Sequence, residues 1–474
     1  MTGIFLIGTI LIGVLLYLNK NTIVHYSVVG VYVLLLMIFV SYEYLHINET
    51  ENLFFKPDAL SVLLLFALCV VSLPAIYHTY KYMVIHNETP RPRGLFFAAM
   101  IFLISAICMA YVANNIAVMW IFVEITTLSA SVLIYHHRNI RALEGVWKYV
   151  FICAISITFI YIGILFLSLA MKEAGIETFS FDALMAHAPQ LDPFWLKLAF
   201  LFIFTGFTAK IGLVPMYTAG IDAKDKAPAP AGALLSSILM NMGFVGIYRV
   251  YAIISKTEIQ SWAATVMIVS AILSIFVATV YMINIKNIKR MFAYSSIEHM
   301  GIVVLGLAVG GIGTYAAILH VILHTFVKPA LFFQFNQVYR VYQSKNIYDT
   351  GHYFKYNKAG ALVLLLGFFS ATAMPPSGLF ISEFLIFQSL FEARMFILLV
   401  VVLLLLTMII WGFGSNIFKL LFTPPAAINE KQIPRISPWD SVTQYALLAL
   451  AVFFAYHPPA TFVQLMHEAV KLIH

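Results

Sequence analysis

Six ionisable side chains stand inside long apolar runs, where burying a charge is so costly that such a residue usually has a function. They are Glu124, Lys210, His320, His324, Lys328 and Glu383. Carboxylates, amines and imidazoles can all take up and release protons, and the chain carries all three types in turn. The set is typical of a proton relay, since no cluster of aromatic residues with a matched charge indicates a pocket for a solute.

Three of these residues follow one another at intervals of four, namely His320, His324 and Lys328. At 3.6 residues per turn this spacing leaves them on one helical face, about 6 Å apart along the axis. Pro329 comes directly after Lys328 and should loosen the helix there. One histidine would usually be a core residue with satisfied hydrogen bonds, but three titratable groups in register favour a functional role.

Two of the charges lie beside helix-breaking prolines. Lys210 precedes Pro215, and Glu383 follows Pro375 and Pro376. Interrupted spans in corresponding positions of two halves are typical of inverted repeats that hold ion sites near the middle of the bilayer. The alternative for Lys210 is a side chain that merely extends towards the lipid headgroups.

Glu124 has no basic residue within a turn or two of it in the sequence. Its carboxylate must therefore be protonated, hydrated or paired with another helix, and a purely structural ion pair is the alternative to a functional role. Further polar residues in neighbouring spans could support a relay or could hydrogen-bond helices together. These supporting residues are Ser236, Ser237, Asn241, Tyr294, Ser295, Ser296, Glu298 and His299.

The elements that position these residues follow from the composition. The 474 residues are 62% hydrophobic and only 10% charged, whereas an average soluble domain is about one quarter charged. So little charge cannot cover a globule of this size, and the apolar excess must face lipid. Runs of about 20 apolar residues predict an all-α polytopic membrane protein with about fourteen spans, centred near residues 10, 34, 68, 102, 125, 159, 206, 240, 272, 300, 326, 375, 408 and 450.

Positively charged residues lie mainly in the odd-numbered loops, which include Lys224 and Lys289, and are fewer in the even-numbered loops, which include Arg249. The positive-inside rule then places the odd loops in the cytoplasm and both termini outside. This bias also explains the net charge of +7, so a nucleic-acid partner is excluded. Residues 1–20 lack a basic n-region and a cleavage site, and they predict a first span rather than a signal peptide.

No cofactor or metal site of the chain's own is expected. Cys69, Cys108 and Cys153 are far apart and form no CxxC pair, so they are predicted to be small apolar fillers of helices. The sequence also lacks the GxGxxG, P-loop, HExxH and GxSxG patterns that indicate nucleotide, metal or nucleophile chemistry. The chain is therefore expected to move ions rather than to catalyse a redox reaction.

Six motifs together resemble one known family. They are FVEITTLSA, TAKIGLVPM, DKAPAPAGALLSS, RMFAYSSIEHMG, HVILHTFVKPALFF and MPPSGLFISEF. They cover roughly residues 95–390 and occur in the same order in the antiporter-like subunits of respiratory complex I and of membrane-bound hydrogenases. The strings AYSS-x-EHMG and MPP-x-x-LF-x-SEF are most similar to component F of the hydrogenase-4 type, as in formate hydrogenlyase assemblies.

The resemblance implies a fold of fourteen transmembrane helices with two inverted five-helix repeats, spans 4–8 and 9–13, in which helices 7 and 12 are broken. Spans 1–3 would occupy residues 1–94, and the first repeat residues 95–255. The second repeat would occupy residues 256–422, and a loop with the last span residues 423–474.

The resemblance also implies roles for individual residues. Glu124 resembles the family's glutamate of span 5, and Lys210 its partner lysine on the broken span 7. The stripe from His320 to Lys328 resembles the bridging residues of span 11, and Glu383 the exit-side acidic group of the broken span 12.

The chain departs from the family pattern at two notable positions. Tyr217 stands where a histidine is common, within a YTAGID run that replaces the usual sequence. Asn241 stands where complex I relatives often have a lysine on span 8, which removes one titratable group. A relay would need water at Asn241.

The predicted function is that of a proton-translocating membrane subunit of a redox-driven complex in a prokaryotic cytoplasmic membrane. Lys210 would hold a proton while Glu124 is ionised nearby and would release it when the pair separates, because burial disfavours an unpaired ammonium. The proton would continue along the histidine stripe to Glu383 and leave on the outer side. The energy would come from a peripheral hydrogenase or quinone-reductase module.

Two other functions remain open from the sequence. The same relay would serve a cation/proton antiporter of the Mrp type or an ion-coupled carbon-uptake subunit. A transporter of an organic solute would need a substrate pocket instead. Whether the transported ion is H⁺ or Na⁺ is likewise open.

Overall fold

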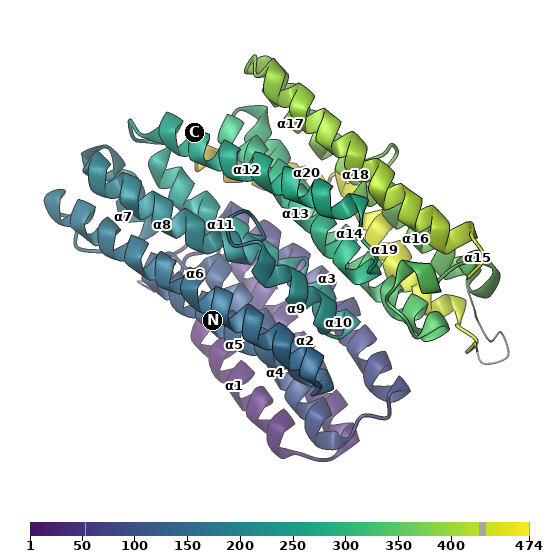
Figure 1. The fold of residues 1–474 in the computed structure, drawn as a ribbon. Coiled ribbons are helices and arrows are strands. Elements are labelled where there is room, and N and C mark those ends of the chain that lie inside the picture. The colour runs from purple at the N-terminus through teal and green to yellow at the C-terminus, as the bar shows by residue number, and fades with distance from the viewer. Residues whose placement is uncertain (53, 426–432, 474) are drawn as a thin grey trace. The chain divides into compact units, whose positions relative to one another are not determined.

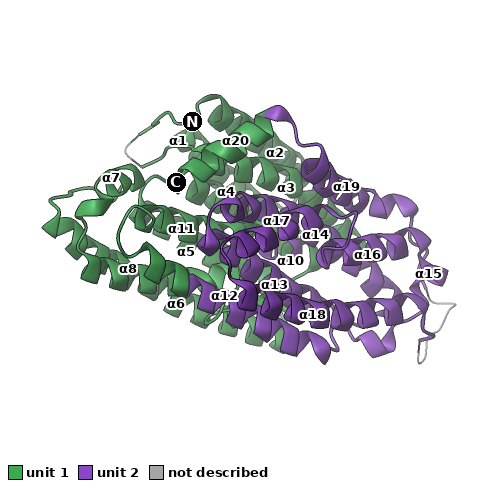
Figure 2. Ribbon diagram, turned by 90° about the horizontal axis from the view of Figure 1, so that it is seen from above, with its two compact units in different colours: residues 1–231, 238–265, 461–474 green, residues 232–237, 266–460 purple. Residues whose placement is uncertain are grey.

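The computed structural model describes residues 1–52, 54–425 and 433–473, and these residues are predominantly helical (Figure 1). Residues 426–432 of the predicted last loop lie outside the described residues. The chain divides into two compact units, which Figure 2 distinguishes by colour. Unit 1 comprises residues 1–231, 238–265 and 461–474, and unit 2 comprises residues 232–237 and 266–460.

Unit 1 is built from long apolar helices with short helices in some of the connections. They are α1 (Thr2–Leu18), α2 (Thr22–Leu45), α3 (Ala59–Ile85), α4 (Pro90–Val112), α5 (Ile116–Ile134), α6 (Ile140–Glu173), α7 (Phe181–Ala186), α8 (Pro193–Ile211), α9 (Thr218–Lys226), α11 (Ile238–Ile254) and α20 (Ala460–Lys471). The short helix α10 (Ala229–Leu235) and the long helix α12 (Gln260–Ile283) each pass from one unit into the other.

Unit 2 has the same construction. Its helices are α13 (Ile288–Val309), α14 (Ile312–Tyr342), α15 (Tyr353–Tyr356), α16 (Lys358–Ala371), α17 (Gly378–Glu392), α18 (Phe396–Phe422) and α19 (Val442–Tyr456). Between α13 and α14 the chain reverses through Gly310 and Gly311, whose φ angles of 78° and 58° favour glycine.

The helices are long and apolar enough for a multi-pass membrane protein, as the composition predicts. Among the described residues, 11 helices could cross a membrane, or 12 if the bent pair Pro438–Tyr456 and Ala460–Lys471 forms one span. The predicted count of fourteen is not confirmed, because α1 and α16 are apolar but shorter. Outer helices such as α18 expose apolar side chains, whereas α14 is buried throughout its most apolar window.

Both predicted helix breaks are present. In unit 1, α8 ends at Ile211 with Gly212 in the left-handed region at φ 88°, and α9 begins at Thr218, so Pro215 lies in the gap. In unit 2, residues 372–377 separate α16 from α17 and contain Pro375 and Pro376. In unit 2 both half-helices, α16 with 14 residues and α17 with 15, are shorter than a spanning helix needs to be, whereas α8 is itself one of the 11 counted spans. The short half-helices of unit 2 are one reason why the span count falls below fourteen.

Three cations assigned to loops by the charge count are in fact buried. Lys224 lies on α9 and donates a hydrogen bond from Nζ to Met240 Sδ at 3.0 Å. Arg249 lies on α11, with Nη2 3.1 Å from Asp58 Oδ2, and Lys289 lies over the ring of Phe335. Their assignment to loops was wrong, since all three lie on helices. Flanking polar residues make a buried helix end resemble a loop in the sequence.

Candidate functional site

A cluster in unit 1 surrounds Lys210, which is only 3% exposed. Its Nζ donates a hydrogen bond to Thr127 Oγ1 at 2.6 Å and lies 3.6 Å from Cys153 Sγ. The same ammonium lies 5.7 Å from the centre of the Tyr149 ring. We call Glu124, Thr127, Tyr149, Cys153 and Lys210 the lysine cluster.

The break in the span explains how a lysine can be accommodated here. Lys210 occupies the last turn of α8, immediately before the left-handed Gly212. The carbonyl groups at a helix C-terminus carry partial negative charge and stabilise a nearby cation. By ending α8 inside the apolar region, the break supplies such a terminus next to a buried ammonium.

Glu124 lies one helical turn before Thr127 on α5. Its Oε2 is buried and has no hydrogen-bond partner among the described residues. Among the described residues no ion pair within 4.0 Å joins Glu124 to Lys210, whose Nζ bonds Thr127 instead. The structure thus places the ammonium of Lys210 on the hydroxyl of Thr127, one helical turn along α5 from Glu124.

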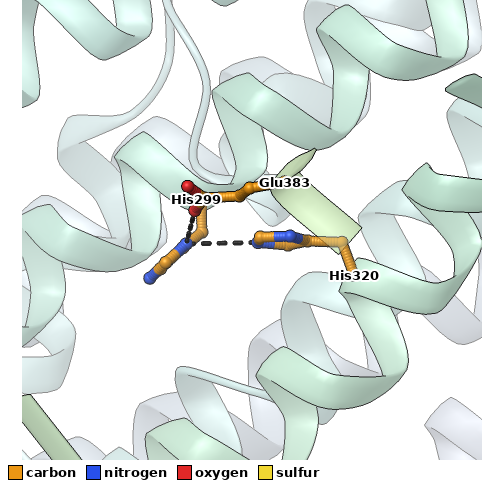
Figure 3. Close-up of side chains that lie close together, drawn as sticks. All are labelled: His299, His320 and Glu383. Atoms are coloured by element: carbon orange, nitrogen blue, oxygen red, sulfur yellow. Dashed lines mark hydrogen bonds and ion pairs between the residues drawn. The ribbon is translucent and has the colours of Figure 1, made fainter. Parts of the chain in front are cut away.

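A second cluster, in unit 2, joins side chains from three helices (Figure 3). His320 on α14 forms hydrogen bonds through both ring nitrogens, from Nδ1 to Ser382 Oγ at 2.9 Å and from Nε2 to His299 Nδ1 at 3.1 Å. Ser382 Oγ donates its hydrogen to the Leu379 carbonyl at 3.0 Å. The serine must therefore accept from His320 Nδ1–H, which leaves a lone pair on His320 Nε2.

Two carboxylates complete the second cluster. His299 Nδ1 on α13 lies 3.5 Å from Glu383 Oε1 on α17 and 3.6 Å from Oε1 of its neighbour Glu298. All three residues are buried. We call Ser295, Glu298, His299, His320, His324, Lys328, Ser382 and Glu383 the histidine cluster.

The rest of the predicted stripe lies along α14 as the spacing predicts. His324 is fully buried, and its ring centre lies 5.4 Å from that of His299. Lys328 Nζ donates a hydrogen bond to Ser295 Oγ at 2.7 Å, one turn before His299 on α13. The stripe on α14 therefore faces the polar stripe on α13 along several turns.

The other supporting residues have structural contacts. Ser236 and Ser237 donate to the carbonyl of Ala233, Ser296 donates to that of Phe292, and the Tyr294 ring stacks on Tyr281. Asn241 is fully buried on α11.

Four cluster members were not among the predicted site residues, namely Thr127, Tyr149, Cys153 and Ser382. Thr127 stands three residues after Glu124 and Ser382 directly before Glu383, so their positions in the sequence were a usable signal. Cys153 was predicted to be an apolar filler, and its contact with Lys210 corrects that interpretation. Tyr149 and Cys153 are one turn apart on α6, and neither side chain is charged, so the search for charges in apolar runs passed over them.

Comparison with known proteins decides the family. Residues 113–409, more than half of the chain, match the NADH:quinone oxidoreductase/Mrp antiporter transmembrane family. The chain belongs to this family. The matched region of this antiporter-family chain contains every residue of the two clusters.

Individual relatives agree with this assignment. A hydrogenase-4 component F homolog of Methylacidiphilum infernorum is 28% identical over 368 residues, which cover 77% of this chain and 76% of that protein. NADH-quinone oxidoreductase subunit N 2 of Rhizobium meliloti is 26% identical over 384 residues, which cover 80% and 77%. The predicted resemblance to complex I and hydrogenase-4 subunits is therefore confirmed.

Solved structures share the fold. A chain of the membrane-bound sulfane sulfur reductase, an archaeal respiratory membrane complex, is similar with a TM-score of 0.86 at 20% identity, covering 99% of this chain and 96% of that one. A chain of the Mrp complex from Dietzia sp. has a TM-score of 0.84 at 15% identity, covering 100% and 97%. The antiporter-family chain is thus an integral, multi-pass, antiporter-like membrane subunit, and such subunits have lipid and other membrane subunits as neighbours.

Proposed function

We propose that this antiporter-like subunit translocates protons through its two buried clusters, driven by a redox reaction in a peripheral hydrogenase or quinone-reductase module. The relay residues are Glu124, Lys210, His320, His324, Lys328 and Glu383. The observation that carries the proposal is the contact series in unit 2, in which His320, His299 and Glu383 approach one another at 3.1 and 3.5 Å inside membrane helices.

In the lysine cluster, Lys210 is the proposed switch. While Lys210 bonds Thr127, the carboxylate of Glu124 keeps an atom without a partner, and burial makes that arrangement costly. Movement of the ammonium by one turn would pair the two charges and stabilise the proton on Lys210. Return of the ammonium to the neutral hydroxyl would favour release of the proton.

In the histidine cluster, the proposed path runs through imidazole nitrogens. The lone pair on His320 Nε2 can accept the proton of His299 Nδ1, and His299 in turn lies next to the carboxylates of Glu298 and Glu383. Glu383 is the proposed exit group beside the break of residues 372–377. We further propose that the chain lies in a prokaryotic cytoplasmic membrane with both termini outside, and that Asn241 acts through a bound water.

The test is coupled proton pumping in inverted membrane vesicles that contain the whole complex. Lys210→Ala and Glu124→Gln should each abolish pumping while the subunit still copurifies with its partners. Glu258→Gln, the same change at an exposed position of unit 1, serves as the matched control. Unchanged pumping in the Lys210 and Glu124 variants would refute the proposal. Pumping that requires added Na⁺ would identify Na⁺, rather than H⁺, as the transported ion.

A further inference from the structure

The side chains of His299, His320 and Glu383 converge from α13, α14 and α17 with the spacing of metal ligands (Figure 3). His299 Nδ1 lies 3.1 Å from His320 Nε2 and 3.5 Å from Glu383 Oε1, and the three ligand atoms all lie within 4.8 Å of one another. In a tetrahedral zinc site with bonds near 2.0–2.1 Å, neighbouring ligand atoms are about 3.4 Å apart. The two distances from His299 Nδ1 bracket this value.

A fourth candidate ligand, a second carboxylate oxygen, lies beside the three. Glu298 Oε1 is 3.6 Å from His299 Nδ1, and Glu298 Oε2 has no hydrogen-bond partner among the described residues although the residue is only 2% exposed. A buried carboxylate oxygen without a partner is costly. A cation at this position would satisfy it and would also balance the charge of Glu383.

The surroundings fix the orientation of one ligand, and a cavity borders the two carboxylates. The hydrogen bond between His320 Nδ1 and Ser382 Oγ holds the imidazole ring with its Nε2 lone pair towards His299, which is the arrangement that supports metal-bound histidines. A cavity of about 170 Å³ borders the two carboxylates, Glu298 and Glu383, and Thr372 and Thr407 are also in its mostly apolar lining, which includes neither histidine. Its volume is several times that of one water molecule, about 30 Å³.

We propose that His299, His320 and Glu383 bind a divalent transition-metal ion of the zinc class, with Glu298 as an additional oxygen ligand. Two imidazoles with carboxylates suit Zn²⁺, whereas Mg²⁺ and Ca²⁺ prefer sites made of oxygen alone. Binding requires His299 to carry its proton on Nε2, so that Nδ1 offers a lone pair. A bound ion would occupy the imidazole lone pairs that the proposed proton path uses, and it would therefore inhibit proton transport. This inhibition rests on the proposed function, whereas metal binding itself does not.

The binding test uses the purified full chain in lipid nanodiscs, without a histidine tag. Titration with ZnCl₂ against a chromogenic chelator should give one ion per chain, and zinc-edge X-ray absorption should show nitrogen and oxygen ligands near 2.0–2.1 Å without sulfur. His320→Gln should weaken zinc binding by at least about 100-fold, and Ser382→Ala by about tenfold. His457→Gln, at an exposed histidine of the same unit, should leave zinc binding unchanged.

The metal-site proposal is overturned if the wild type and His320→Gln bind zinc with equal affinity. It is also overturned if the wild type is monodisperse and helical but binds no zinc. Helical circular dichroism and a symmetric elution profile are required of every variant. Measurement of proton pumping by the whole complex distinguishes the failure of the metal-site proposal from the failure of the proton-translocation proposal. Zinc that binds at this site without slowing pumping would refute the proton path through the histidines, whereas absent binding together with pumping that depends on His320 would refute only the metal site.

Discussion

The lysine cluster and the histidine cluster solve the problem of buried charge in different ways. In the lysine cluster one cation bonds a neutral hydroxyl, and the nearest carboxylate keeps an oxygen without a partner. In the histidine cluster the Nδ1 of His299 lies 3.1 to 3.6 Å from a second imidazole and from two carboxylates, so that groups from three helices meet at one atom. The first arrangement contains a gap between acid and base, and the second is nearly continuous.

The difference indicates that the two clusters serve different steps of transport, gating in the lysine cluster and storage and passage in the histidine cluster. A gap that one side-chain movement can close is suited to a step that must be gated, because the charge is stabilised in only one of two positions. A continuous series of groups is suited to storage and passage, because each proton position lies next to another. Substitutions in the two clusters should therefore differ in how strongly and in what manner they affect transport.

After the loss of pumping expected for Lys210→Ala and Glu124→Gln, the largest effect is expected for His320→Ala. It removes the group that joins Ser382 to His299 and therefore interrupts the continuous series. Groups that transfer protons typically contribute at least about 100-fold to a rate, and we expect coupled pumping in vesicles to fall by about that factor. His457→Gln is the control, and pumping within twofold of wild type in His320→Ala would mean that the series carries no protons.

A smaller effect is expected for Thr127→Val. The change keeps the shape of the side chain but removes the acceptor for Lys210 Nζ, and a lost hydrogen bond to a charged group is worth about 1.5–3 kcal/mol. The ammonium should then favour Glu124, so pumping should slow by about tenfold while assembly is retained. Ser131→Ala, on the same helix but half-exposed, is the control, and full pumping by Thr127→Val would show that the hydroxyl is no part of the switch.

The helix packing that supports the lysine cluster offers a third test. Gly206 lies one turn before Lys210, and a Cβ added there would collide with Ile160 and lie 2.6 Å from the carbonyl oxygen of Ser156 on α6. Gly206→Ala should lower the free energy of unfolding by about 1–3 kcal/mol, as measured by thermal unfolding of the purified chain. Gly30→Ala, where a Cβ meets nothing within 4 Å, should not destabilise.

The smallest effect is expected where charges are exposed. Lys148 and Glu144 form an ion pair on α6 with side-chain exposures of 52% and 60%. Exposed pairs contribute at most about 1 kcal/mol, so Glu144→Gln should leave pumping intact and change the free energy of unfolding by less than about 0.5 kcal/mol. A large loss would show that solvent-exposed charge matters as much as the buried clusters.

The sequence predicted the charged residues inside apolar runs well, because apolar neighbours in the sequence show that the charge must be desolvated at a high free-energy cost. A lysine or glutamate within an apolar run is visible without a structure, and so is the helical register of His320, His324 and Lys328. The two breaks were predictable because a proline inside an apolar run removes a backbone hydrogen bond of the helix. The signal is not sufficient by itself, since α14 continues through Pro329, where the sequence predicted a loosened helix.

The partners of these residues could not be predicted. Whether Lys210 meets Glu124 or Thr127 depends on a rotation and a distance between helices, and no spacing along the chain records either. The burial of Lys224 and Arg249 was missed because loop-like composition says nothing about which helix covers a polar segment. The convergence of His299, His320 and Glu383 likewise exists only after three helices have packed.

The tight turn at Gly310 and Gly311 bears on the order in which the histidine cluster is completed during synthesis. His299 and His320 are 21 positions apart on the two arms of this hairpin, so their contact can form as soon as α14 has left the ribosome. Ser382 is 62 positions further along than His320. Synthesis of these 62 residues takes on the order of several seconds at 5–20 residues per second. During that time His299 and His320 lack Ser382, whose hydroxyl orients the ring of His320. A nascent chain stalled before α17 would expose this unfinished pair to the membrane insertion machinery.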